Sequence, residues 1–343
     1  MMQMDPDVIA PNLKRRLSGV TSTVVRLIPI QARQMAVVTT GPGLPANLPH
    51  MPLWRVALLA RSRWRVWHAR RNSEMVLGLL LRRVLGRRFK LLFTSAAQRD
   101  HKPFTKRLIA RMDALIATSA KAAGYLQRPA TVILHGVDTA VFAPAADRAA
   151  LRTTLGLPDG MLIGCFGRVR AQKGVDLLVE AALELLPSRP GVSVIFTGLV
   201  TRENAGFHAG LTKRIVAAGL QDRIRFLGEL PWEQVVRHYQ ALDLFCAPAR
   251  WEGFGLTPLE AMACGVPVVA ADVGAFDQLI TAQVGTIVPP GDRAALTEAL
   301  RGWIDDPLRL AAGGVAARAH VLAHHRIESE AQAICDVYRQ LLA

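Results

Sequence analysis

The residue types best suited to chemistry gather in one short stretch, which reads Arg250-Trp251-Glu252-Gly253-Phe254-Gly255-Leu256-Thr257-Pro258-Leu259-Glu260. The glycines on either side of Phe254 allow the backbone to approach a ligand closely. A helix is expected to begin near Thr257, and the free N–H groups of its first turn suit a diphosphate. Glu252 then stands at the mouth of the loop and Glu260 in the first helical turn. The stretch predicts a site for a phosphorylated ligand with two carboxylates beside it.

A second stretch supplies cations. It follows the apolar segment 161–166 and reads Gly167-Arg168-Val169-Arg170-Ala171-Gln172-Lys173-Gly174. A doubly wound domain places its phosphate-binding loop directly after such a strand. The pattern of a Walker loop is absent, but Arg168 and Lys173 are suited to neutralising the charge of a departing diphosphate. Two cations on a loop are also common on solvated surfaces, and the glutamate loop in the same half of the chain is what favours a binding site.

Glu260 has a structural alternative. Thr257 and Glu260 have the spacing of a capping box, and Pro258 would stand at the first helical position. Glu260 would then serve the helix rather than a ligand. The loop around Glu252 has no such explanation, because Gly-Phe-Gly is costly to order without a ligand.

Together the two stretches resemble family 4 of the retaining glycosyltransferases, whose GT-B fold has two facing Rossmann-like domains. That family carries a Gly-Arg-x4-Lys-Gly loop and two glutamates separated by seven residues around Gly-Phe-Gly, and both patterns are intact here. The resemblance implies that Arg168 and Lys173 bind the diphosphate of a nucleotide sugar and stabilise it as it leaves. It also implies that Glu252 acts beside the donor sugar and that Glu260 binds the ribose hydroxyls. The other donor-binding residues that it implies are Gly253, Phe254, Gly255, Leu256 and Thr257.

The N-terminal part carries weaker pieces of the same resemblance. Residues 16–21 resemble the family's glycine loop, which touches the diphosphate from the opposite domain, although Gly19 is the single glycine there. His68 follows a predicted strand where the family often has a histidine near the reacting sugar, which implies a catalytic role. A lone histidine is otherwise more often a packed or surface residue. Residues 135–138, His-Gly-Val-Asp, resemble the interdomain segment Asn-Gly-Val-Asp.

The amino-acid sequence of two stretches, 68–72 and 93–99, is similar to that of lipopolysaccharide core mannosyltransferases. This similarity implies GDP-mannose as the donor substrate and a lipid A–Kdo inner core as the acceptor, with no cofactor. The alternative within the same family is a UDP-sugar-dependent glucosyl- or galactosyltransferase acting on a glycolipid or polysaccharide.

Positioning such loops requires alternating strands and helices. From about residue 160 the sequence repeats a short apolar run, a loop and an amphipathic run, which predicts βαβ units and a mostly parallel sheet. The first third repeats this pattern less regularly. We therefore expect an α/β protein with an acceptor-binding Rossmann-like domain over residues 1–145 and a nucleotide-sugar-binding one over 146–325. A helix over 326–343 is expected to pack back on the first domain.

The charge is unevenly distributed. Residues 1–113 hold 21 basic and 5 acidic side chains, so they carry the excess behind the net charge of +15. Such asymmetry indicates an anionic partner for the first domain. Arginines interleaved with Trp54, Trp64, Trp67 and Phe89 favour an anionic membrane surface, contacted mainly by the predicted helix 74–85. A basic nucleic-acid-binding protein is the alternative from another class, and it is disfavoured because no nucleic-acid-binding motif accompanies the charge.

The cysteines, the length of the apolar runs and the placing of the acidic residues indicate the cellular compartment and the need for a metal. The four cysteines are scattered through apolar stretches, which is typical of buried thiols in a reducing compartment. No apolar run is long enough to span a bilayer, and residues 1–16 lack the apolar core of a signal peptide. We expect a cytoplasmic protein, peripheral on the inner face of the plasma membrane. No pair of acidic residues resembles a metal site, so a metal-independent reaction is predicted.

Overall fold

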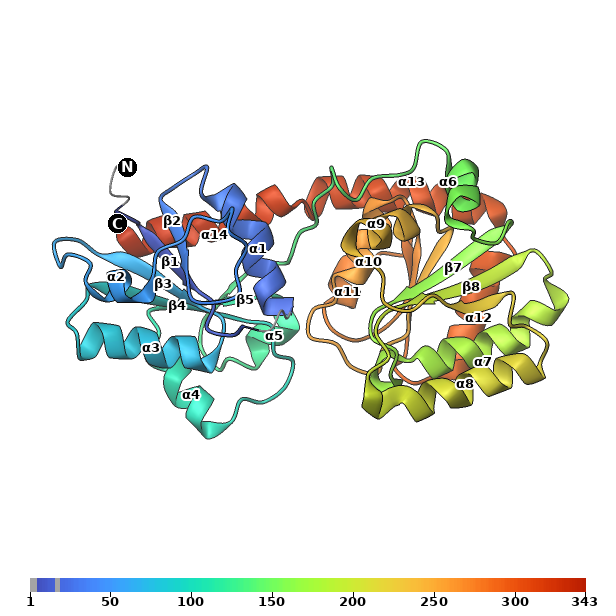
Figure 1. Ribbon diagram of the computed structural model, residues 1–343, viewed down its shortest axis with the longest axis horizontal. Helices are drawn as coiled ribbons and strands as arrows, with labels where there is room; N and C mark the ends of the chain where they lie inside the picture. Colours follow the sequence, from blue (N-terminus) through green and yellow to red (C-terminus); the bar gives the residue numbers. More distant parts are fainter. Residues whose placement is uncertain (1–4, 16–18) are drawn as a thin grey trace. The chain divides into compact units, whose positions relative to one another are not determined.

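The computed structural model describes residues 5–15 and 19–343. It divides into two compact units (Figure 1), one formed by the chain up to His135 together with Ile327–Ala343 and the other by Gly136–Arg326. No helix in the described part of the chain is long and apolar enough to cross a membrane.

The N-terminal unit is built on a sheet of six parallel strands in the order β2-β1-β3-β4-β5-β6. The strands are β1 (Val8–Pro11), β2 (Val37–Thr40), β3 (Arg65–Ala69), β4 (Phe89–Ser95), β5 (Ala114–Ala117) and β6 (Thr131–Val132). The helices of this unit are α1 (Gly19–Gln31), α2 (Leu53–Ala57), α3 (Asn72–Arg83), α4 (Pro103–Ile109), α5 (Ala120–Gly124) and α14 (Ile327–Leu342).

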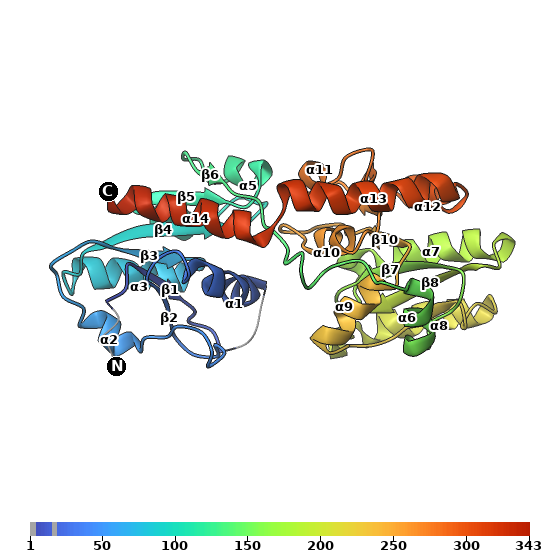
Figure 2. The same cartoon turned by 90° about the horizontal axis from the view of Figure 1, so that it is seen from above.

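Alternate side chains of these strands enter two separate cores, because successive residues of a strand point to opposite faces of the sheet. Val8 and Val66 pack with α1 and α14 on one face, whereas Ile9 and Trp67 pack with α3 and α4 on the other. Figure 2 shows α14 running along the sheet of this unit although it is the last helix of the chain. Helices cover both faces, so the unit is doubly wound.

The C-terminal unit repeats this architecture with the strand order β12-β11-β10-β7-β8-β9. Its strands are β7 (Met161–Phe166), β8 (Val192–Thr197), β9 (Ile224–Phe226), β10 (Leu244–Ala247), β11 (Val268–Ala271) and β12 (Gly285–Val288), and every pair is parallel. Its helices are α6 (Arg148–Leu155), α7 (Val175–Leu185), α8 (Ala205–Ala217), α9 (Trp232–Gln240), α10 (Thr257–Ala263), α11 (Phe276–Leu279), α12 (Arg293–Ile304) and α13 (Pro307–His324). Helices α7, α8 and α12 share one core with β7, β8 and β10, and α10 packs against β10, β11 and α13.

The predicted fold class is confirmed, since both sheets are parallel and flanked by helices. The unit boundary, between residues 135 and 136, falls earlier than the expected 145/146, and the last helix belongs to the N-terminal unit. Helices α6, α12 and α13 were not predicted from the sequence. Alanine is the commonest residue of α13 and two adjacent glycines lie in its middle, so its apolar periodicity is weak, and helix capping by Asp306 is its clearest local signal.

Candidate donor site

In the C-terminal unit the strand order reverses between β7 and β10, which lie side by side. Ligands of doubly wound domains bind beyond the carboxyl ends of the strands at this switch point. Residues 167–174 leave the carboxyl end of β7, and residues 248–256 leave that of β10. The two stretches singled out from the sequence therefore meet at the position where this fold holds its ligands.

Lys173 and Glu252 form an ion pair across the two loops, between Nζ and Oε2. The side chains are 23% and 19% exposed, so the pair is half-buried. The other carboxylate oxygen of Glu252 accepts a hydrogen bond from the Gly253 amide at 3.2 Å. Glu252 thus already neutralises Lys173, and an anionic ligand must compete with it.

A small cavity of about 20 Å³ lies beside this pair, lined by Cys165, Gly167, Lys173, Glu252 and Thr257 among others. Burial raises the pKa of the Cys165 thiol to about 12, and nearby Lys173 lowers it only in part. The thiol is therefore protonated at neutral pH and does not serve as a nucleophile. All four cysteines are buried and free, as expected from the sequence.

A second ion pair fastens the two loops together. Arg250 donates to both carboxylate oxygens of Asp176, at 2.8 and 2.6 Å, and its amide donates to the Gln172 carbonyl at 2.8 Å. Gln172 in turn donates to the Trp251 carbonyl at 3.1 Å. Two parallel bonds between a guanidinium and a carboxylate fix the orientation of the two groups as well as their distance. This contact therefore keeps the loops that carry Lys173 and Glu252 in a fixed relative position.

The Gly-Phe-Gly loop is ordered by packing, which corrects the expectation that only a ligand would order it. Phe254 is buried, and its carbonyl accepts a hydrogen bond from the Ala275 amide at 3.1 Å. Gly255 has a φ of +86°, and a Cβ there would stand 2.3 Å from the ring of Phe276. The burial of Phe254 offsets the conformational cost of the two glycines, and the loop is preorganised.

Glu260 has a partner that the sequence did not reveal. The fully buried Tyr239 donates its hydroxyl to Glu260 Oε2 at 2.9 Å. Burial, and then the charge of Glu260, raises the pKa of Tyr239 well above its ordinary value, so the hydroxyl stays a donor. Helix α10 begins at Thr257, with Leu256 in αR conformation before it and no side-chain cap. The capping-box interpretation is therefore wrong, because Thr257 lies one position too late to cap the helix.

Arg168 is an exposed cation of this site. It lies on the surface directly after Gly167, and within the described residues it makes no hydrogen bond or ion pair. Gly198 allows this turn, since a Cβ at Gly198 would meet the Gly167 carbonyl oxygen at 2.0 Å. Arg168 is thus free to meet an anion, whereas Lys173 must exchange partners.

In the N-terminal unit the sheet order reverses between β1 and β3. Gly19 begins α1 after β1, and His68 is the penultimate residue of β3. Residues 16–18 of the predicted glycine loop lie outside the described residues, and a Cβ on Gly19 would meet no atom within 4 Å. Both N-terminal predictions therefore fall next to a switch point, but Gly19 itself is not needed for a close approach in this conformation.

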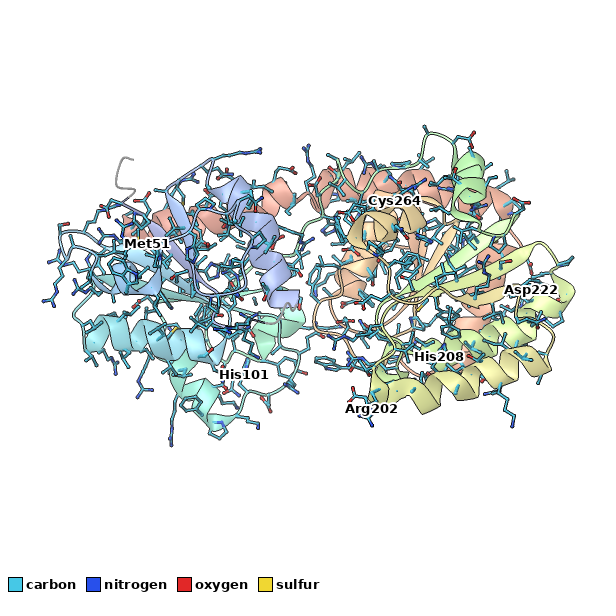
Figure 3. The ribbon with its side chains drawn as sticks, viewed as in Figure 1. Met51, His101, Arg202, His208, Asp222 and Cys264 are labelled. Carbon is cyan, nitrogen blue, oxygen red and sulfur yellow. The ribbon has the colours of Figure 1, made fainter. Side chains whose placement is uncertain are left out.

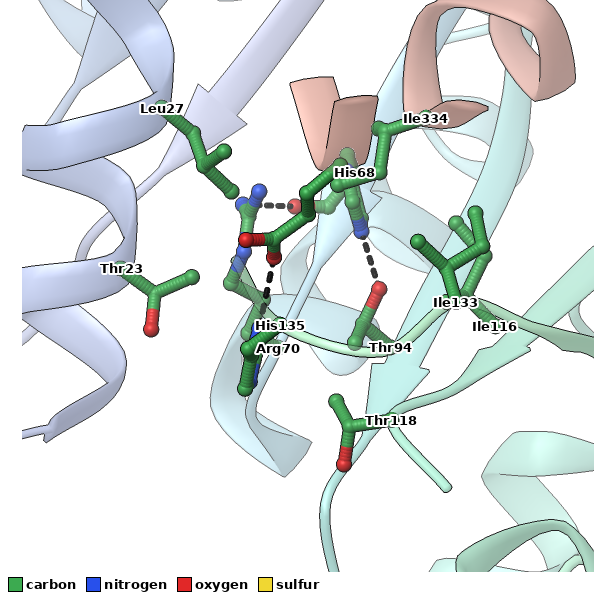
Figure 4. Close-up of a pocket in the computed structure, with 11 residues that line it drawn as sticks. Thr23, Leu27, His68, Arg70, Thr94, Ile116, Thr118, Ile133, His135 and Ile334 are labelled. Carbon is green, nitrogen blue, oxygen red and sulfur yellow. Dashed lines mark hydrogen bonds and ion pairs between the residues drawn. The ribbon is translucent and has the colours of Figure 1, made fainter. Parts of the chain in front are cut away.

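His68 is fully buried, and both its ring nitrogens are engaged; Figure 4 shows the contact with Thr94. Nδ1 lies 2.6 Å from the hydroxyl of Tyr338, and Nε2 lies 2.6 Å from that of Thr94. Burial, and then the charge of Arg70, holds the pKa of His68 well below its ordinary value. A neutral, doubly hydrogen-bonded imidazole tying β3 to β4 and α14 favours a structural role, and the catalytic role stays a prediction.

His68 lines a cavity of about 10 Å³ with Arg70, Thr118 and His135. His135 Nδ1 lies 2.6 Å from Glu330 Oε1, and Figure 4 shows His135 beside Arg70. The Thr118 hydroxyl is buried and has no hydrogen-bond partner within the described residues. Polar side chains share the lining of this cavity with leucine and isoleucine side chains, and the cavity lies at the carboxyl ends of β3, β4 and β5.

Arg71 organises the loops at this edge. It pairs with the buried Glu74 at 2.9 Å and donates to Asn12 at 2.8 Å and to Thr21 at 3.0 Å. Asn12 and Thr21 flank the loop that leads to Gly19. The charged run after His68 thus positions the neighbouring loop, a role that no sequence signal had indicated.

Comparison with known proteins agrees with this geometry. The model for glycosyl transferases group 1 matches residues 147–320, the part of the chain that holds the Lys173–Glu252 pair. The chain is 52% identical to the lipopolysaccharide core biosynthesis mannosyltransferase LpcC of Rhizobium leguminosarum bv. viciae, over 98% of this chain and 97% of the relative. It is 48% identical to LpsB, of the same description, from Rhizobium meliloti strain 1021, over 98% of both. The chain belongs to the group 1 glycosyltransferases.

Solved structures support the GT-B fold. Anabaena Alr3699/HepE in complex with UDP has a TM-score of 0.84 at 20% identity, covering 97% of this chain and all of that one. The C-terminal domain of a group 1 glycosyltransferase (LpcC) from Francisella tularensis covers 56% of this chain, with a TM-score of 0.54 and 31% identity.

Within the C-terminal unit the structure thus brings Lys173, Glu252, Gly253 and Thr257 to one cavity and its rim. Phe254 and Gly255 hold the loop in its conformation through packing, and Glu260, in the first turn of α10, accepts a hydrogen bond from Tyr239. His68 and Gly19 lie in the N-terminal unit. The sequence analysis missed Tyr239, Asp176 and Arg71, because each acts through a partner distant in sequence.

Proposed function

We propose that this glycosyltransferase transfers mannose from GDP-mannose, with retention of anomeric configuration, to a lipid A–Kdo inner-core acceptor of lipopolysaccharide. The observation that carries the proposal is the preorganised group of Lys173, Glu252 and Glu260 behind the exposed Arg168, at the switch point of a doubly wound unit. Support for mannose and lipopolysaccharide comes from two relatives, both described as core biosynthesis mannosyltransferases and matched over 98% of this chain.

The chemistry assigned to these residues follows the movement of charge. As the bond from the anomeric carbon to the diphosphate breaks, negative charge grows on the departing oxygens and positive character grows on the sugar. Arg168 and Lys173 stabilise the departing diphosphate. Release of Lys173 leaves the Glu252 carboxylate to hydrogen-bond the sugar hydroxyls and face the developing positive charge. Glu260, oriented by Tyr239, binds the ribose hydroxyls.

We further propose that two cations suffice for leaving-group stabilisation, so that the reaction needs neither a divalent metal nor a cofactor. A side-chain pair that can neutralise two phosphate charges supplies the electrostatic stabilisation that a metal ion gives in other transferases. Metal independence is thus a property to be tested on the enzyme itself.

We assign acceptor binding to the N-terminal unit and propose that this unit rests peripherally on the anionic cytoplasmic face of the plasma membrane. Helix α3 and its C-cap residue expose an apolar stripe, Val76, Leu80 and Val84, at helical spacing, with the exposed Arg83 beside it. Apolar and basic side chains on one helical face suit an interface with anionic lipid. Cations over aromatic rings recur in this unit, with Lys90 5.0 Å from the centroid of Trp64. Nucleic acid is not a proposed partner.

A donor panel tests the proposed function. The full chain is incubated with Kdo-lipid A and GDP-mannose, UDP-glucose, UDP-galactose or ADP-glucose, in excess EDTA, and the product is analysed by mass spectrometry and NMR. The proposal expects a hexose added from GDP-mannose alone, with the anomeric configuration of the donor retained. Turnover restricted to UDP-sugars, dependence on Mn²⁺ or inversion of configuration would each contradict the corresponding part.

A further inference from the structure

A second cavity of the C-terminal unit lies away from the donor loops. It has a volume of about 510 Å³, within the range of small-molecule pockets of roughly 300–1,000 Å³. Asp243 and Pro267, which directly precede β10 and β11, contribute to its wall. The cavity therefore opens at the amino ends of these strands, whereas the donor loops leave their carboxyl ends. Nothing in the proposed transfer reaction uses it.

The walls of this cavity are mostly apolar. Helix α13 contributes Leu310, Ala311 and Val315, and the loops around it contribute Pro144 and Pro267. Figures 1 and 3 show α13 beside α10, whose C-terminal neighbour Cys264 also lines the cavity. Val315 is 76% exposed. A large β-branched side chain at the mouth of a cavity suits an apolar ligand body.

The polar lining of the cavity is positively charged. Arg148, Arg318 and Asp243 are its charged residues, and Arg152 lies behind Asp243 at 2.5 Å. The lining therefore holds two guanidinium groups and one carboxylate, and that carboxylate is already paired with Arg152 outside the lining. The first turn of α13, an 18-residue helix, also lines the cavity and adds positive potential at its end.

Among these cations, Arg148 is the one available to a ligand. Arg318 is occupied by the carbonyls of Thr139, Phe142 and Ala263, at 2.7–2.9 Å. Within the part of the chain that the structure describes, the Arg148 side chain makes a single hydrogen bond, to Asp243 at 3.1 Å, and it is 34% exposed. Since guanidinium has five N–H donors, Arg148 retains most of its donors for an incoming anion.

We propose that this cavity binds a fatty carboxylate, with the carboxylate on Arg148 and the acyl chain along Val315 and Ala311. A carboxylate matches the fork of a guanidinium, and the apolar wall of α13 accounts for a hydrocarbon body. The excess of positive charge selects an anion over a neutral or cationic amphiphile of the same length.

Calorimetric titration of the full chain with octanoate, below its micellar range, tests the proposal. Saturable binding at one site is expected, with 1-octanol binding roughly tenfold more weakly because it lacks the charge-assisted contact. Octylammonium is expected not to bind. Equal affinity for octanoate and 1-octanol would overturn the assignment of the carboxylate to Arg148.

Two variants locate the site. Arg148→Gln should weaken octanoate binding by roughly tenfold, and it should fold, since Asp243 keeps Arg152 and the Leu162 amide at 2.5 and 2.7 Å. Val315→Glu should abolish binding by placing a negative charge on the wall. Val216→Glu on α8, an exposed valine outside the cavity, is the matched control and should leave binding unchanged.

Arg83→Gln and Lys173→Gln separate this cavity from the basic face of α3 and from the donor loop. Both should bind octanoate as the unmodified chain does. Loss of binding in either of them, or unchanged binding in Arg148→Gln and Val315→Glu, would show that the amphiphile sits elsewhere and would overturn the proposal.

Discussion

Replacing Tyr239 by Phe isolates the contact that holds Glu260. The ring should stay in place, because it packs 4.5 Å from the centroid of Phe166 and 5.5 Å from that of Phe245. What is lost is one hydroxyl-to-carboxylate hydrogen bond of 2.9 Å. Such bonds to a charged group contribute about 1.5–3 kcal/mol. Glu260 is half-buried and water can replace part of the contact, so we expect a loss near the lower limit.

The effect on nucleotide binding should pass through Glu260. Glu260→Gln removes the charge that strengthens two ribose contacts, and we expect GDP to bind roughly tenfold more weakly, equivalent to about 1.4 kcal/mol. Tyr239→Phe keeps the charge but frees the carboxylate to change rotamer, so about a two- to fivefold loss is expected. In the double variant the loss should equal that of Glu260→Gln alone, because Tyr239 has no other route to the ligand.

Calorimetry of GDP binding, together with thermal unfolding of each variant, provides the measurements. Tyr338→Phe is a matched control, since it removes another buried hydroxyl contact, to His68 at 2.6 Å, in the N-terminal unit. It should lower stability without changing GDP affinity. The reasoning would be refuted if Tyr239→Phe bound GDP with full affinity, or if the two losses were additive in the double variant.

Three further outcomes follow from the structure. Glu252→Gln should tighten GDP binding by about two- to fivefold in calorimetry, because the ion pair that occupies Lys173, worth about 0.5–1 kcal/mol, is lost. Sugar transfer should fall sharply. Weaker GDP binding would contradict the inference that Glu252 and the diphosphate compete for Lys173. Burial, and then the charges of His320 and His324, lower the pKa of His325 from 6.5 to about 4. Between pH 6.5 and 4 the unfolded chain therefore binds a proton there that the folded chain does not, and the free energy of unfolding should decrease by about 1.4 kcal/mol for each unit by which the pH falls. His325→Gln should flatten this dependence of Tm on pH, and an unchanged slope would exclude His325 as its cause. Arg83→Glu should weaken co-sedimentation with anionic liposomes, whereas Arg82→Glu should mainly lower Tm, because Arg82 is paired with Asp113 at 2.6 Å. Equal binding to neutral liposomes, or tighter binding to duplex DNA, would contradict the proposal that this unit binds an anionic membrane.

The parts of the fold that could be predicted from the sequence are those with strong local signals. The strand Met161–Phe166 is a continuous apolar run, as expected for a strand covered on both faces, and its observed limits are those of the apolar segment identified in the sequence. The stretches after β7 and β10 were placed correctly because the ends of neighbouring parallel strands converge on a single edge. Helices rich in alanine and glycine, such as α13, were missed because propensity without periodicity does not mark a boundary.

The candidate site was predictable in its charged residues but not in their support. Lys173 and Glu252 lie far apart in the sequence, and the resemblance alone suggested that they act together. The role of Phe254 as a buried anchor bonded to the Ala275 amide, and of Tyr239 as the donor to Glu260, depends on tertiary packing that no spacing encodes. His68 illustrates the reverse case, because the motif around it implied catalysis, whereas its burial between Thr94 and Tyr338 favours a structural role.

Thermal stabilisation by GDP, UDP and ADP, measured side by side in EDTA, tests the central claim that residues 167–174 and 250–260 form a metal-independent diphosphate site. A ligand that binds the folded state raises apparent stability, by about 2.7 kcal/mol at a hundredfold excess over its Kd. The account predicts the largest rise in Tm with GDP, and its loss in Arg168→Gln and Lys173→Gln. A rise of the same size in those two variants, or a rise that appears only with added Mn²⁺, would contradict it.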